Sequence, residues 1–203
     1  VMAADADAAV ARPLIPRILL AFLACCGAGA ASADAWQGDQ HSGSLQFTAI
    51  QAGAKFTSDF ERFHVRFDFD EARPAAGRLD VTVETKSVNT ADADRDGILR
   101  GRDFFWCEQY PEAVYHAEKF ERDGAGWRAH GELSMRGVTR PVAVRFELTP
   151  GPMQLVMKGT SDLRRLEFGV GQGEWSSTEW VGDEVGVLFD LKLLPDALPA
   201  GAP

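Results

Sequence analysis

Alternating apolar and polar residues dominate the chain after residue 34. The most regular run is 63–69, in which Phe63, Val65, Phe67 and Phe69 alternate with polar residues. A period of two places all the apolar side chains on one face of a β-strand. Similar runs occur at 45–49, 79–83, 133–135, 142–148 and 185–193. Because parallel strands are apolar on both faces, this clean alternation predicts antiparallel pairing.

Turn-forming residues separate these runs. Examples are Arg73-Pro74, Asp123-Gly124-Ala125-Gly126, Arg136-Gly137 and Pro150-Gly151-Pro152. Short strands at regular intervals, joined by such turns, are typical of an all-β sandwich or barrel.

One segment, 94–112, does not alternate. Its residues Ile98, Leu99, Arg102 and Phe105 recur at a spacing of three to four, which predicts a helical turn or two. We expect this short helix to lie across one end of a barrel and to end at Tyr110-Pro111, because the residue before a proline disfavours helical geometry.

The N-terminal region has the pattern of a secretory signal peptide. Arg12 and Arg17 precede the apolar run 18–26, and small residues follow up to Ala33. The run is shorter than the roughly 20 residues that a transmembrane helix needs. We therefore expect a signal peptide over 1–33 cleaved near Ala33, a periplasmic barrel domain over 34–195 and a loose tail over 196–203. An uncleaved anchor and lipidation of Cys25 stay open as alternatives.

Charge and aromatic content narrow the choice of ligand. The 203 residues include 21 basic and 30 acidic side chains, for a net charge of −9. Such a surface repels phosphate backbones, so no nucleic acid partner is expected. The chain has 13 Phe but only 2 Tyr, which indicates an interior rich in aromatic rings that carry no polar group.

The sequence Asp92-Ala93-Asp94-Arg95-Asp96-Gly97 resembles a calcium-binding loop, with Asp103 near the closing position. Three features argue against a metal there. The closing acid has a short side chain, arginines stand inside the loop, and the preceding segment is predicted to be a strand. We interpret the loop as a structural turn over the end of the barrel and expect no metal site.

Groups able to perform catalysis are few. His41, His64, His116 and His130 are not spaced as metal ligands on one helix, and Cys107 lacks a cysteine partner. No G-x-S-x-G motif is present. No catalytic residue and no cofactor is therefore expected. One alternative is an enzyme that uses Arg95, Asp96 and His116 at the barrel mouth. Another is a stress-related module that binds a protein partner through an exposed apolar patch.

Several sequence blocks in order resemble the YceI-like family of exported, lipocalin-like proteins. The blocks are Asp39-Gln40-His41-Ser42, Phe67-Asp68-Phe69-Asp70, Lys86-Ser87-Val88-Asn89-Thr90, residues 95–105, Tyr110-Pro111, residues 131–142, Arg165-Leu166-Glu167-Phe168-Gly169-Val170 and Val181-Gly182-Asp183-Glu184-Val185. Gly97 and Trp106-Cys107 stand where the family more often has other residue types. The resemblance implies an interior tunnel for a long isoprenoid chain, and these departures bear on where that tunnel ends and on the length of its ligand.

This resemblance implies an eight-stranded antiparallel, lipocalin-like barrel with a short helix between strands. It also implies a non-enzymatic carrier that holds a long isoprenoid, a quinone or another amphiphilic lipid in its interior. Whether the chain forms a homodimer is left open. The residues expected to line the ligand cavity are Phe47, Phe67, Phe69, Val81, Val83, Leu99, Phe104, Phe105, Val144, Phe146, Phe189 and Leu191.

Overall fold

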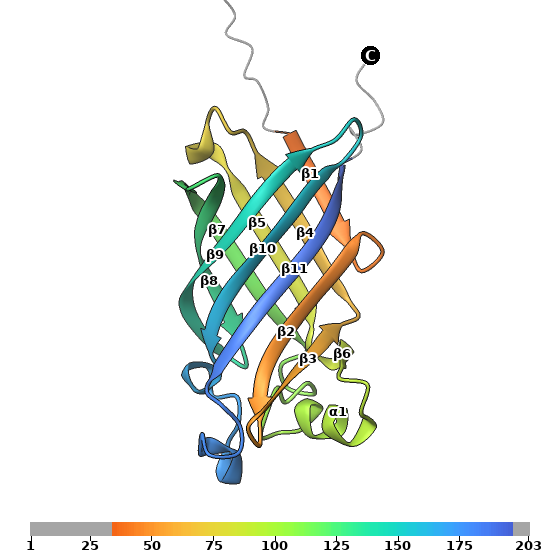
Figure 1. Ribbon diagram of the computed structural model, residues 1–203, viewed down its shortest axis with the longest axis vertical. Helices are drawn as coiled ribbons and strands as arrows, with labels where there is room; N and C mark the ends of the chain where they lie inside the picture. Colours follow the sequence, from red (N-terminus) through yellow and green to blue (C-terminus); the bar gives the residue numbers. More distant parts are fainter. Residues whose placement is uncertain (1–33, 197–203) are drawn as a thin grey trace, which may run out of the picture. The chain divides into compact units, whose positions relative to one another are not determined.

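A computed structural model describes residues 34–196, which form an antiparallel β-barrel with one short α-helix (Figure 1). The expected signal peptide and nearly all of the expected tail lie outside the described residues. In chain order the elements are β1 (Asp34–Asp39), β2 (Gly43–Gln51), β3 (Ala54–Phe60), β4 (Phe63–Phe69), η1 (Pro74–Ala76), β5 (Arg78–Glu84), η2 (Thr85–Ser87), β6 (Val88–Asn89), α1 (Ala93–Arg100), β7 (Glu112–Asp123), β8 (Gly126–Met135), β9 (Val138–Pro150), β10 (Leu155–Arg164), η3 (Arg165–Phe168), η4 (Gly173–Ser176) and β11 (Glu184–Pro195).

The eleven strands of the sheet form an eight-stranded barrel because three barrel strands are interrupted. β1 and β2 follow one another along the edge of β11, with Trp36 opposite Pro195 and Phe47 opposite Val187. β4 and β3 pair with β1 and β2 in turn, and β5 and β6 pair with β4 and β3. The β1–β11 pairing closes the barrel. The expected fold class, an eight-stranded antiparallel barrel with a short helix, is confirmed.

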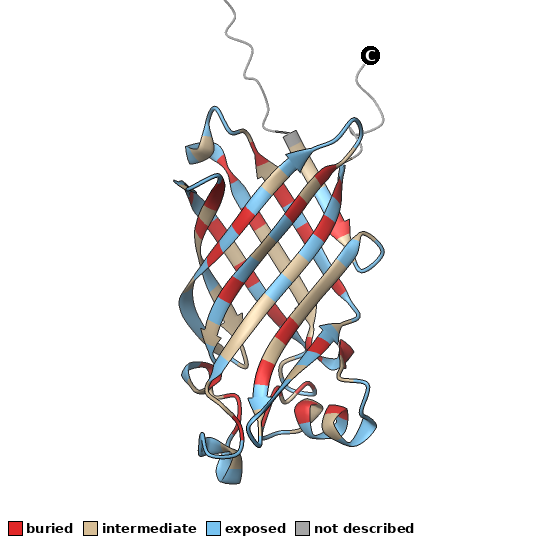
Figure 2. Ribbon diagram, in the orientation of Figure 1, coloured by how far each residue is buried: buried red, intermediate tan, exposed pale blue. Residues whose placement is uncertain are grey.

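The predicted apolar phases point into the barrel. In β4, Phe63, Val65, Phe67 and Phe69 are buried while the residues between them are more exposed. Figure 2 shows this alternation of buried and more exposed positions along the strands of the wall. Burial on a single face explains why the period of two is so regular in the sequence.

The sequence pattern missed the short strands β1, β3 and β6 and also two long strands, β7 and β10, the latter two for different reasons. In β7 the pairing register shifts between Ala117 and Lys119, and the bulge turns Phe120 inward out of phase with Tyr115. In β10 the inward positions pass from Met157 to residues with little or no side chain, Gly159 and Ser161. Neither run therefore shows a clean apolar period of two.

The two ends of the barrel differ. The β4–β5, β7–β8 and β9–β10 connections gather at the end shown at the top of Figure 1, which we call the closed end. The opposite end, the mouth, carries the β2–β3 and β8–β9 turns, α1 and the long β10–β11 connection.

Helix α1 lies at the mouth and has the predicted length of about two turns, but it begins and ends earlier in the chain than the sequence spacing predicted. It ends at Arg100, Gly101 follows in extended conformation, and the segment up to Tyr110 forms turns. Gly101 has the low helix propensity of glycine, and Trp106 adopts a left-handed φ of 49° that no α-helix contains. The expected end at Tyr110-Pro111 was therefore wrong.

The acidic loop begins this helix. The Asp92 carboxylate accepts hydrogen bonds from the backbone N–H groups of Asp94 and Arg95, at 3.1 and 3.0 Å. Asp96 is buried, and its Oδ1 accepts from the backbone N–H and the hydroxyl of Thr90 at 2.8 and 2.7 Å. The carboxylates thus fix a helix N-terminus, where the sequence had predicted a structural turn.

Removing the capping carboxylate should weaken the helix. We expect Asp92→Ala to lower the free energy of unfolding by about 1 kcal/mol, because two backbone donors lose their acceptor. Urea unfolding followed by fluorescence measures this loss. The exposed Asp94, in the same helix turn, supplies the control Asp94→Ala, which should cost less. Equal losses in the two variants would contradict the capping role.

Carboxylates on the outer face make the stability of the fold depend on pH. Hydrogen bonds from arginine or histidine side chains lower the pKa values of four of them, Asp70, Glu84, Glu121 and Asp123. A carboxylate whose pKa is lower in the folded state stabilises the fold above its unfolded pKa and loses this contribution as the pH falls through its folded pKa. We expect the urea midpoint to be level above about pH 5 and to fall steadily towards about pH 3. A midpoint unchanged by acid would contradict this.

Candidate functional site

The barrel interior contains an apolar cavity, which we call the inner chamber. Its volume is about 150 Å³, and its lining includes Leu45, Val81, Leu133, Val144 and Leu191. These side chains come from β2, β5, β8, β9 and β11, so residues far apart in the sequence meet through barrel closure.

Glycines keep two aromatic rings against the wall. A Cβ atom at Gly131 would lie 2.6 Å from Cζ of Tyr115, and one at Gly159 would lie 2.4 Å from Cζ of Phe189. Both rings therefore occupy space that a larger residue would fill, and this helps to leave the inner chamber open. Glycine within a strand commonly marks such a close approach.

A second space, the mouth chamber, has a volume of about 330 Å³. Its apolar lining includes Leu99 of α1, Phe104 and Phe105 of the following turns, and Trp175 of η4. Five residues line both chambers, Phe47, Phe60, Met135, Leu163 and Val187. The two chambers are therefore neighbours, one at the mouth and one inside the barrel.

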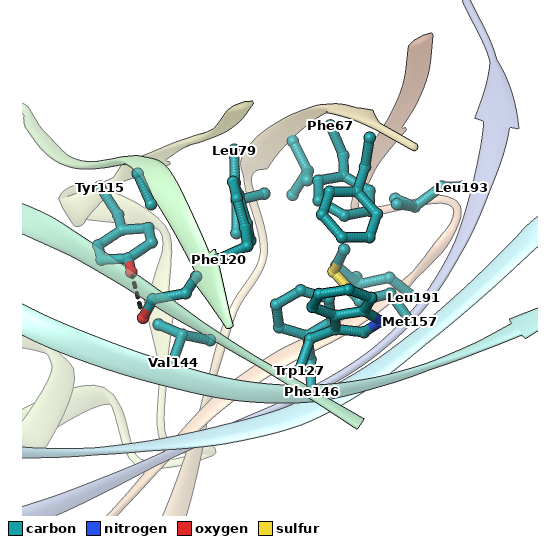
Figure 3. Close-up of a cluster of buried hydrophobic side chains, with 14 of the residues drawn as sticks. Phe67, Leu79, Tyr115, Phe120, Trp127, Val144, Phe146, Met157, Leu191 and Leu193 are labelled. Atoms are coloured by element: carbon teal, nitrogen blue, oxygen red, sulfur yellow. Dashed lines mark hydrogen bonds between the residues drawn. The ribbon is translucent and has the colours of Figure 1, made fainter. Parts of the chain in front are cut away.

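The cavity stops at an aromatic plug near the closed end, formed by Phe67, Phe69, Phe120, Trp127 and Phe146. All five side chains are buried, and the rings pack in stacked, tilted and edge-on pairs with centroids 4.9 to 6.3 Å apart. Figure 3 shows labelled members of this buried cluster. None of the five lines either chamber.

The outside of the plug is also covered. A Cβ atom at Gly77 would lie 2.8 to 2.9 Å from the rings of Phe69 and Phe120, so the β4–β5 connection packs directly on the plug. Beside it, the Arg122 guanidinium lies 4.1 Å from the centre of the Trp127 ring and also pairs with Glu71 at 2.6 Å.

Polar groups of the inner wall bind to the barrel itself. The Tyr115 hydroxyl donates to the carbonyl of Val142 at 3.2 Å, and the Ser161 hydroxyl donates to that of Ala143 at 2.9 Å (Figure 3 shows the position of Tyr115). Burial raises the pKa of Tyr115, so its hydroxyl keeps its proton near neutral pH. The inner chamber therefore presents an apolar surface.

Charged side chains stand at the mouth. Asp92, Asp94 and Arg95 contribute to the lining of the mouth chamber. The Arg95 guanidinium lies 4.8 Å from the centre of the Phe56 ring and 3.4 Å from Asp92 Oδ2. A ligand with an apolar body and a polar end would thus meet polar groups only at the rim.

Arg165 holds the mouth loop in place, a role that no sequence pattern indicated. Its buried guanidinium donates to four backbone carbonyls, those of Val170, Ser177, Val181 and Gly182, at 2.7 to 3.2 Å. Burial lowers the pKa of this group. Because its acceptors are backbone atoms, no spacing of residue types could reveal the arrangement.

The predicted lining residues fall into three groups. Phe47, Val81, Val83, Val144, Phe189 and Leu191 line the inner chamber, and Leu99, Phe104 and Phe105 line the mouth chamber. Phe67, Phe69 and Phe146 point inward as expected but belong to the plug. Contact of any of these residues with a ligand stays a prediction.

The residues of the enzyme alternative are not gathered into one group. Arg95 and Asp96 lie on α1, and Asp96 is engaged by Thr90. His116 lies on the outward phase of β7, where its Nδ1 is 2.7 Å from Asp80 Oδ1.

Cys107 is buried beside Phe104 and Phe105 in a second apolar cluster. Within residues 34–196, no helix has the length and apolar character to cross a bilayer.

A small antiparallel barrel with an apolar interior cavity and polar groups at one mouth is typical of ligand-binding barrels. The chain belongs to the YceI-like domain family, whose model matches residues 36–193.

Individual relatives agree with this assignment. A UPF0312 protein of Photorhabdus laumondii is 38% identical over 89 residues, which are 44% of this chain and 46% of that protein. The chain thus spans about half the length of the curated relatives it matches. The crystal structure of Burkholderia cenocepacia BcnA is 25% identical, with a TM-score of 0.73, and covers 76% of this chain and 98% of its own. A domain of Saccharophagus degradans described as polyisoprenoid-binding shares the fold at 14% identity, with a TM-score of 0.59 over 80% of this chain and 99% of its own.

Proposed function

We propose that this protein binds an apolar, lipid-like molecule of the isoprenoid or quinone type inside its barrel and carries it through the periplasm without changing it chemically. The observation that carries the proposal is the pair of adjacent chambers, of which the inner one is apolar and the outer one has charged groups at its rim.

The physical chemistry of the cavity supports binding of this kind. Each Å² of apolar surface removed from water contributes about 25 cal/mol, so a hydrocarbon chain can bind without specific polar contacts. Tyr115 and Ser161 already donate to backbone carbonyls, so an apolar ligand leaves their hydroxyls bonded. The rim at Asp92 and Arg95 can then hold a polar end group in contact with water.

Two further observations support the choice of ligand and compartment. The Saccharophagus degradans domain of the same fold is described as polyisoprenoid-binding. The basic, apolar and small-residue segments of 1–33 match the pattern of an export signal.

Recovery of a ligand tests this function. The full chain, expressed in a Gram-negative bacterium and purified without detergent, should give a native mass spectrum with a bound species that organic solvent extracts. Fractionation should place the protein in the periplasm with Asp34 as its first residue. Ligand-free protein that also takes up no apolar fluorophore would overturn the binding function, and retention in the cytoplasm would overturn the location.

A further inference from the structure

We infer that the aromatic plug limits the ligand to a short apolar chain, of about four isoprene units, wholly enclosed within the two chambers. This inference rests on the proposed function and specifies the class of molecule that the cavity takes.

The volumes of the chambers set the limit. An apolar cavity of about 150 Å³ holds a benzene ring, so the inner chamber has room for about six carbon atoms. The mouth chamber, at about 330 Å³, has room for about twice as many. Together they enclose roughly 20 carbon atoms, or about four isoprene units.

The plug prevents the cavity from reaching the closed end. Phe67 and Phe69 stack with ring centroids 5.0 Å apart, and Phe67 meets Phe146 edge-on at 5.7 Å. Phe67 is 0% exposed and Trp127 is 3% exposed, so neither ring can turn without displacing its neighbours. A longer chain would have to open this packing or leave its remaining units outside the mouth. The first alternative loses the ring contacts of the plug, and the second buries no further apolar surface.

A series of prenyl alcohols tests the limit on the unmodified protein. Alcohols with two, three, four, six and eight isoprene units, delivered from a cyclodextrin, would compete with a bound apolar fluorophore. We expect the affinity to rise by at least about tenfold for each unit up to four, because each added unit removes apolar surface from water. From four to eight units it should change by less than about threefold, because the added units stay exposed.

The outcomes separate the two proposals. If no alcohol competes, the proposed function fails. If affinity continues to rise through eight units, the length limit fails while the proposed function stands.

Cavity variants test whether the plug end sets the length. Leu79 and Met157 line the inner chamber next to the plug, and both are buried. Leu79→Ala or Met157→Ala should move the length at which affinity levels off upward by up to about one unit, since each deletes about three heavy atoms from the wall. The outward-facing Val114→Ala should leave it unchanged. An unchanged levelling-off length in two folded cavity variants would overturn the inference.

Discussion

Val187→Trp should weaken binding of an apolar fluorophore by roughly 10- to 100-fold, because a ring at this position excludes two or three methylene groups at about 0.8 kcal/mol each. Val187 points inward opposite Phe47 and lines both chambers. Its new side chain would occupy space where the two chambers adjoin. Fluorescence titration of the unmodified and variant proteins measures the change.

The neighbouring residue provides the control. Leu188 lies on the same strand, faces outward and is 39% exposed. Leu188→Trp should therefore bind the fluorophore as the unmodified protein does. Similar losses in both variants would show that the effect arises from disturbance of β11. Unchanged binding by Val187→Trp would show that the ligand does not occupy the space beside this residue.

Phe67→Ala should lower the free energy of unfolding by about 3–5 kcal/mol, a large part of the 5–15 kcal/mol typical of a domain. Phe67 is 0% exposed and contacts Phe69, Phe120 and Phe146 through its ring. Truncation removes these contacts and leaves a cavity that rigid neighbours cannot fill. Urea unfolding at neutral pH measures the loss.

An exposed aromatic residue gives the comparison for this variant. Trp180 is 64% exposed at the mouth, and Trp180→Ala should change stability by no more than about 0.5 kcal/mol. Phe67→Leu keeps most of the apolar volume and should fall between the two. A loss near zero for Phe67→Ala would mean that the plug yields easily, which would also weaken the limit on ligand length.

The alternation of apolar and polar residues correctly predicted several of the barrel strands. Leu45 to Ala49, Phe63 to Phe69 and Val142 to Leu148 turned out to be parts of barrel strands, and their apolar faces point inward. Alternation does not reveal a strand where an inward position is occupied by a glycine, as at Gly159, because that position has no apolar side chain. It also fails where a bulge shifts the phase, as between Ala117 and Lys119.

The difference between lining and plug could not be read from the same pattern. Phe47 and Phe67 both occupy inward-facing positions of their strands. Phe47 lines the inner chamber, whereas Phe67 belongs to the plug. What separates them is depth along the barrel axis, which depends on how distant strands pair. One signal was present in the sequence, since alternate connections of such a barrel gather at one end. Phe69 and Trp127 both stand beside short connections of the closed end.

The interrupted strands have a mechanical consequence for the wall. The breaks at 40–42, 61–62 and 85–87 fall on three adjacent strands at one level, where Glu61 N–H donates to Ser87 C=O across the gap. The wall is continuous only along the arc from β7 to β11. On the interrupted side, the strands at the mouth can lose their inter-strand hydrogen bonds while the strands around the plug keep theirs. Amide hydrogens of β2, β3 and β6 should accordingly exchange with solvent sooner than those of β4 and β5, because the mouth section can open locally while the section around the plug stays folded.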